Sequence, residues 1–262
     1  MKKSLYILCI LMPLMSCQKK PETNDVIKSN QAKEISFITS DSIKVFGDLY
    51  ELDKNAKTIL LFHQGGSNAR GEYLTIIPKL IKMGFNILAI DQRVGGQVYG
   101  NYNRTIANIP DYNFEDGYSY CDAHSNIEGA LDFIIESGFT GEKILWGSSY
   151  SASLAINLGN KRPNDINKVI AFSPATGNSM KNCLPNASLE TLEVPLLLLR
   201  PPHEMGRENV IAQFELAKAN GHQTYVAKYG VHGASMLVES RVKNDTDQTW
   251  DVVTSFLEQK EQ

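Results

Sequence analysis

Cysteine is scarce in this sequence, and its basic residues form no run. Two of the four cysteines lie within the first 17 residues, which leaves only Cys121 and Cys183 in the rest of the chain. Two cysteines this far apart lack the ligand spacing of a metal site. In an exported protein they could form a disulfide, or they could remain two buried thiols. A formal charge of −3 without a basic run gives no basis for a nucleic-acid partner.

The amino-terminal apolar stretch is too short to span a bilayer. It covers residues 5–15, follows two lysines, and ends just before Ser16 and Cys17. A positive end, a short apolar core and a small residue are typical of an export signal. Leu14-Met15-Ser16-Cys17 also resembles a bacterial lipobox, and this resemblance implies lipidation of Cys17, which would hold the protein to a membrane surface.

The chain therefore divides into three predicted parts. Residues 1–16 form a lipoprotein signal peptide, and the polar residues 17–32 form a flexible tether. Residues 33–262 form one domain, long enough for a sizeable α/β core, with no visible repeat or second domain. The expected location is the bacterial cell envelope, at a periplasmic or outer-membrane surface.

Strand and helix patterns alternate along this domain, which predicts an α/β fold. Strands are expected at 34–39, 44–52, 58–63, 85–91, 143–146, 168–173, 195–200 and 223–229. Helices are expected at 72–83, 122–137, 207–220 and 247–259, and after the strand at 143–146. Pro78 either kinks the first helix or marks where its regular part begins. Such an alternation indicates a mainly parallel sheet with helices on both faces and ligands at the carboxyl ends of its strands.

The most informative stretch joins the strand at 143–146 to the helix that follows it. Gly147-Ser148-Ser149-Tyr150-Ser151 reads as a sharp turn with Ser149 at its apex. In such a nucleophile elbow the apical residue has a strained backbone, and the residues two before and two after it must be small. The usual pattern is Gly-x-Ser-x-Gly, and here Ser151 replaces the second glycine.

Four sites in chain order resemble those of the α/β-hydrolase superfamily. They are His63-Gln64-Gly65-Gly66, Asp91-Gln92-Arg93, the Ser149 elbow and His232-Gly233. The chain is most similar to the compact dienelactone-hydrolase-like and esterase branches, over roughly residues 33–260. This resemblance implies an α/β-hydrolase fold with a mainly parallel eight-stranded sheet and no large lid domain.

The resemblance also assigns catalytic roles. Ser149 would attack a carbonyl carbon, and His232, in a small-residue loop after the last strand, would be its base. The other histidines suit structural roles, and they are His63, His124, His203 and His222.

The acid of the expected triad departs from the family pattern. After the strand at 195–200 the family usually has Gly-x-x-Asp, whereas this chain has Pro201-Pro202-His203-Glu204. Counting along the chain places Glu204 at the acid position, and Glu208 is the fallback, although it could instead cap the next helix.

Two backbone amides would form the oxyanion hole that such chemistry needs. One is the amide of Tyr150, and the other is that of Gly65 or of its neighbour Gln64. This chemistry uses neither a metal nor an organic cofactor.

Two loops are candidates for substrate selection, residues 94–119 and 174–194. The first interleaves tyrosines with asparagines, which would suit a polar or sugar-bearing ester, or which pack the loop onto the body. We expect Arg93 to pair with Asp91 and brace the end of its strand.

The predicted function is that of an exported, lipid-anchored serine hydrolase. It would cleave a small carboxylic ester through an acyl-enzyme on Ser149. A peptidase or amidase with the same architecture is one alternative. A binding protein without catalytic activity on the same scaffold is the other.

Overall fold

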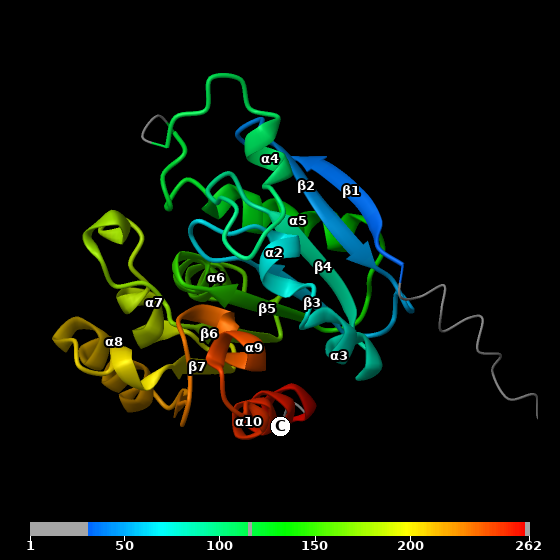
Figure 1. Cartoon of the computed structure of the whole chain (residues 1–262). Coiled ribbons are helices and arrows are strands. Elements are labelled where there is room, and N and C mark those ends of the chain that lie inside the picture. The colour runs from blue at the N-terminus through cyan, green and yellow to red at the C-terminus, as the bar shows by residue number, and fades with distance from the viewer. Residues whose placement is uncertain (1–30, 115–116, 260–262) are drawn as a thin grey trace, which may run out of the picture.

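The protein is described here from a computed structural model, over residues 31–114 and 117–259 (Figure 1). Its centre is an eight-stranded sheet in the order β1-β2-β4-β3-β5-β6-β7-β8. The strands are β1 (Lys33–Ile38), β2 (Lys44–Tyr50), β3 (Thr58–Phe62), β4 (Asn86–Asp91), β5 (Lys143–Ser148), β6 (Lys168–Phe172), β7 (Leu196–Arg200) and β8 (Gln223–Val226). β1, β2 and β4 pair antiparallel, and every pairing from β4 to β8 is parallel. The predicted mainly parallel sheet is confirmed.

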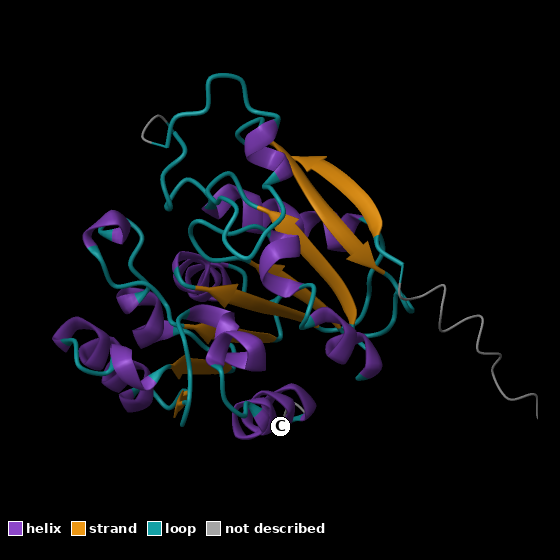
Figure 2. Cartoon of the chain, viewed as in Figure 1, coloured by secondary structure: helices purple, strands orange, loops and turns teal. Residues whose placement is uncertain are grey.

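Helices cover both faces of this sheet, as predicted (Figures 1 and 2). The α-helices are α2 (Ala69–Tyr73), α3 (Ile77–Lys82), α4 (Arg104–Ala107), α5 (His124–Glu136), α6 (Tyr150–Lys161), α7 (Asn186–Thr191), α8 (Glu208–Ala219), α9 (Glu239–Val242) and α10 (Asp247–Glu258). The described residues also form the 3-10 turns η1 (Asn178–Met180), η2 (Pro202–Glu204) and η3 (Gly233–Leu237).

The core consists of two apolar layers, one on each face of the sheet. Alternate residues of a strand point to opposite faces. Leu60 of β3 therefore belongs to the apolar layer that contains residues of α5, α6, α7 and α8, and Leu61 belongs to the layer that contains residues of α2, α3 and α10. Every residue of β3, β4, β6 and β7 is buried. Strands that are buried on both faces read as continuous apolar runs, which is why they were predictable.

The helix predicted at 72–83 is in fact two helices. α2 begins at Ala69, where the side chain of Asn68 accepts the Gly71 N–H, and it ends at Tyr73. Pro78 lies in the first turn of α3, where a missing N–H costs no hydrogen bond. Pro78 therefore marks where a regular helix begins and does not kink a longer one.

Arg93 does not pair with Asp91, contrary to the prediction. Its guanidinium contacts the Asp41 carboxylate at 2.6 Å and bonds the side chain of Asn126. Asp91 instead accepts from Arg104 at 2.6 Å and from the Ala69 N–H at 2.8 Å. The partner of Asp91 comes from α4, a helix that the sequence reading did not predict.

The predictions for the amino terminus lie outside the described residues. This applies to the signal at 1–16 and to Cys17. Within the described part of the chain, no helix is both long and apolar enough to cross a membrane.

Cys121 and Cys183 form a disulfide, one of the two states that the sequence left open. The bond joins the segment before α5 to the segment between η1 and α7, which lie 62 residues apart in sequence. Cys121 follows Tyr120, and Cys183 contacts Met180. The cross-link therefore connects the 174–194 loop to the residues that directly follow the 94–119 loop.

Removing this cross-link should destabilise the domain. Closing a loop of this length in the unfolded chain corresponds to about 4 kcal/mol of folding free energy. We expect the double variant Cys121→Ser/Cys183→Ser to lose this amount in urea unfolding, and the reduced wild type to match it. A double variant that unfolds at the same urea concentration as the oxidised wild type would contradict this.

Candidate active site

Ser149 lies at the apex of the turn between β5 and α6. Its backbone has φ 61° and ψ −121°, a region that costs energy for any residue except glycine. The Ser149 N–H donates to the Phe172 carbonyl at 2.8 Å, which holds the strained residue. Gly147 permits the tight turn, because a Cβ there would lie 2.4 Å from the Ala152 Cα. The local geometry is that of a nucleophile elbow.

Ser151 stands where the elbow pattern usually has glycine, and its hydroxyl has a role of its own. It is fully buried, accepts the Ser148 N–H at 2.9 Å and bonds the Phe62 carbonyl at 2.7 Å. The hydroxyl thus joins the turn to the end of β3. The substitution leaves the elbow intact.

His232 and Glu204 meet although they are 28 residues apart in sequence. The distance from His232 Nδ1 to Glu204 Oε1 is 2.5 Å. The Glu204 side chain is 1% exposed and that of His232 is 44% exposed, so a buried acid holds an accessible imidazole. Pro201 and Pro202 start the short turn η2, which brings Glu204 beneath the loop of His232. Glu208 is exposed in the first turn of α8.

Arg200, at the end of β7, is a second partner of Glu204. Its Nη1 lies 2.8 Å from Glu204 Oε2, and both side chains are buried. Nη2 donates to the Pro174 carbonyl and to the side chain of Gln213. The sequence reading did not assign Arg200 a role. Its position at the end of an apolar strand, four residues before the acid, gave no sign of this contact in the sequence.

These contacts keep Glu204 ionised. Burial alone would raise its pKa, but the hydrogen bonds and charges of His232 and Arg200 outweigh burial and lower the pKa to about 2. Because the folded pKa lies below the ordinary 4.5, the carboxylate stabilises the fold above about pH 4.5. That stabilisation is lost as the pH falls through about 2.

The two candidate oxyanion donors from the loop after β3 differ in their contacts. The Gln64 N–H donates to Glu72 Oε2 at 2.7 Å, so it is already occupied. The Gly65 N–H donates no hydrogen bond to another described residue. A Cβ at Gly65 would lie 2.6 Å from the Tyr120 hydroxyl, so a larger residue there would require the Tyr120 side chain to move. Tyr150 is the first residue of α6, where amides point out of the helix and its dipole favours negative charge.

One pocket of about 270 Å³ contains both Ser149 and His232 on its wall. Tyr120 and Met180, which lie beside the two halves of the disulfide, also line it. The remaining wall is largely polar and includes Thr176, Ser179, Arg207 and Asn209. A larger hollow of about 430 Å³ lies between β1 and α5, but its lining contains no histidine or cysteine.

The tyrosines of the 94–119 loop pack against the protein or face solvent. Tyr99 stacks on Arg241 at 3.7 Å, and Tyr112 contacts Tyr118 at 5.1 Å between ring centroids. Tyr102 is exposed. None of these four lines the pocket of Ser149. The packing alternative therefore describes these four tyrosines better. Tyr120, just beyond the loop, does line the pocket.

Three of the other histidines have structural contacts. His63 is fully buried between the Gln64 carbonyl and the Gln92 N–H, and burial lowers its pKa. His124 lies 3.7 Å from Glu128, and His222 bonds the Leu189 carbonyl.

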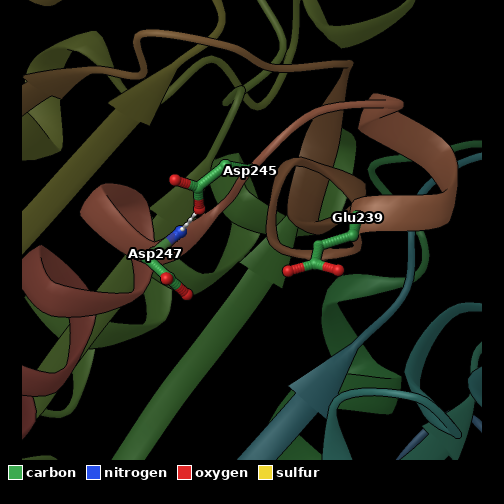
Figure 3. A group of neighbouring side chains, drawn as sticks. All are labelled: Glu239, Asp245 and Asp247. Carbon is green, nitrogen blue, oxygen red and sulfur yellow. Dashed lines mark hydrogen bonds between the residues drawn. The ribbon is translucent and has the colours of Figure 1, made fainter.

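Glu239, Asp245 and Asp247 form the one group of three potential metal ligands among the described residues (Figure 3). All three are exposed, and none lines the pocket of Ser149. Asp245 Oδ1 accepts the Asp247 N–H at 2.7 Å, the bond drawn in Figure 3, which caps the start of α10. Exposed carboxylates gather in this way without a metal, so we assign the group no site.

The sequence matches no protein-family model and no curated protein. Solved structures do match. An esterase from Pyrococcus furiosus has a TM-score of 0.63 at 18% identity, over 91% of this chain and 96% of its own. A dienelactone hydrolase from Anabaena variabilis has a TM-score of 0.63 at 14% identity, over 86% and 96%. An acylaminoacyl peptidase from Pyrococcus horikoshii has a TM-score of 0.63 at 14% identity, over 92% of this chain but 44% of its own.

The protein therefore has the α/β-hydrolase fold, as the sequence resemblance implied. Its similarity to esterases and other hydrolases is distant. At these identities the neighbours show the fold alone, so the chemistry has to be argued from the residues of this chain.

Proposed function

We propose that this protein is a serine hydrolase that cleaves carboxylic esters through an acyl-enzyme on Ser149. The supporting observation is that the strained Ser149 and the His232–Glu204 pair lie at one pocket. A serine hydroxyl is a weak nucleophile until a base takes its proton, and an imidazole held by a buried carboxylate is such a base.

The proposed reaction has two halves. In the first, Ser149 Oγ bonds to the ester carbonyl carbon while its proton passes to His232 Nε2. Glu204 stabilises the resulting imidazolium through Nδ1. The amides of Gly65 and Tyr150 bind the oxyanion, and the departing alcohol takes the proton from His232. In the second half, His232 takes a proton from a water molecule whose oxygen bonds to the acyl carbon. The bond from that carbon to Ser149 Oγ then breaks, His232 returns the proton to Ser149 Oγ, and the acid is released.

The pocket favours a small, polar ester. Its volume is about 270 Å³, and hydroxyl, amide and guanidinium groups line much of it. A long bare acyl chain would bury little apolar surface there and would displace water from polar groups. The peptidase alternative gains support from the neighbour that is an acylaminoacyl peptidase, although this chain spans 44% of that protein.

The location is also a proposal. Export and lipidation are supported by the sequence, in which two lysines, an apolar stretch and Ser16 precede Cys17. An anchored enzyme would meet its substrate in the cell envelope.

A fluorophosphonate probe tests the chemistry directly, because it bonds covalently to an activated serine. We expect peptide mapping of the labelled protein to find the adduct on Ser149, and prior heat denaturation to abolish labelling. A folded sample that remains unlabelled would favour the binding-protein alternative. Short-chain aryl esters compared with matched aryl amides then separate esterase from peptidase, since turnover of amides alone would overturn the ester assignment.

A further inference from the structure

Glu72 is a fully buried carboxyl group with no role in the reaction proposed above. It lies on α2, next to the loop that follows β3. Glutamate side chains are almost never fully buried without partners, because burial disfavours their charged form. The burial of the Glu72 carboxyl group therefore has to be explained by its contacts.

The first contact of Glu72 is with the oxyanion loop. Its Oε2 accepts the Gln64 N–H at 2.7 Å, and Gln64 directly precedes the candidate donor Gly65. The carboxyl group thus fixes the peptide that leads into the oxyanion hole. Replacing it with an apolar side chain would leave a buried N–H without an acceptor.

Arg241 joins the backbone of α2 to the segment after His232. Arg241 Nη1 donates to the Glu72 carbonyl at 3.0 Å and to Ser235 Oγ at 3.1 Å. Arg241 Nη2 donates to the Gly71 carbonyl at 2.7 Å. α2 and η3 are therefore held together beneath the site.

Ser148, the residue before the nucleophile, completes this cluster. Its Oγ accepts the Ala234 N–H at 3.0 Å. A Cβ at Gly233 would lie 2.3 Å from Ser148 Oγ and 2.7 Å from Gln64 Oε1, so both oxygens lie against the backbone beside His232. Gln64 Oε1 is buried and has no hydrogen-bond partner among the described residues. Acceptors are in excess here, so a proton on the Glu72 carboxyl group would find a partner.

The electrostatics agree with this geometry. Burial raises the pKa of Glu72 to about 7, while the hydrogen bond from the Gln64 amide and the charges of Arg241 and His232 oppose the rise. The charged groups that face it are Arg241 from α9 and His232 from the loop before η3. Its other titratable neighbours are phenols that stay neutral, because burial raises their pKa values well above 10, namely Tyr73 and Tyr150.

We propose that Glu72 is a positioning residue of the site, whose carboxyl group fixes the Gln64–Gly65 loop against the elbow at Ser148 and sets the charge beneath His232. This inference rests on the proposed ester hydrolysis. A negative Glu72 attracts a proton to His232, whereas a neutral Glu72 does not, and the reaction needs His232 without that proton.

The test compares the pH dependence of ester hydrolysis and probe labelling in the wild type and in Glu72→Gln. Glutamine keeps the size of the side chain and an acceptor for the Gln64 N–H, but it cannot become negative. We expect the acid limb of the kcat/KM profile to move to lower pH by about half a unit, since one attractive charge near His232 is removed. The matched control is Glu258→Gln, at an exposed position on α10, which should leave the profile unchanged.

A Glu72→Gln profile that overlays the wild type would overturn the proposal, because a purely structural role would survive the change. A wild type that neither labels nor hydrolyses esters would instead refute the proposed function. Should Glu72→Gln fail to fold, carbon-13 NMR of the wild-type glutamate carboxyl groups measures the titration of Glu72 directly. We then expect one carboxyl to titrate near pH 7, and titration of every carboxyl below about pH 5 would reject the inference.

Discussion

Ser149→Ala should lower the turnover of a small aryl ester by a factor on the order of 10⁶. The variant loses the only group at the apex of the elbow that can bond to the carbonyl carbon. His232 and Glu204 remain in place, but the imidazole then has no hydroxyl to activate. Because the residues of a triad act as a unit, removing the nucleophile lowers kcat by about as much as removing all three residues. The measurement is kcat under saturating ester.

The matched control for this experiment is Ser255→Ala. Ser255 is an exposed serine on α10, and it does not line the pocket. Its replacement should leave kcat within about twofold, since surface substitutions away from the site have small effects. Residual turnover of Ser149→Ala within about a hundredfold of wild type would mean that another group performs the chemistry.

Much of the fold could be predicted because the interior of a parallel sheet leaves a simple pattern. Thr58–Phe62 and Leu196–Arg200 are short, mostly apolar runs between turn residues, and both have a strand on either side in the sheet. The short helices were not predicted because they are too short to leave a pattern in the sequence. α4 has four residues, too few to show a helical period, and it depends on Asn103, whose side chain accepts the Ile106 N–H.

The site was predictable only in part. Ser149, His232 and Glu204 each follow a strand. The elbow pattern pointed to Ser149, and chain order and loop position pointed to the other two. Arg200 and Glu72 were missed because their roles depend on residues that the fold brings together. An arginine at the end of an apolar strand gives no sign that it will be buried against Glu204. Glu72 reads as an ordinary helix residue until α2 is placed beneath the Gln64 amide.

Glu204→Gln should lower kcat/KM by about 10⁴ with little change in the shape of the site. The carboxylate now accepts the proton on His232 Nδ1, which leaves Nε2 free to take the proton of Ser149. A glutamine that bonds Arg200 through its oxygen presents its amide NH₂ to His232. The imidazole must then accept at Nδ1 and carry its proton on Nε2, which is the wrong tautomer for a base.

Stability must be separated from catalysis in this experiment, because Arg200 loses its counter-charge. Breaking a buried ion pair from one side costs about 3–5 kcal/mol, so circular dichroism should first establish a temperature at which Glu204→Gln is folded. Glu208→Gln is the matched control, since Glu208 is the nearest exposed acid of the same type on the chain and was the alternative third member. We expect its kcat/KM to stay near wild type. If Glu208→Gln were the slow variant and Glu204→Gln stayed within tenfold of wild type, the acid of the triad would be Glu208, and the contact between Glu204 and His232 would be structural.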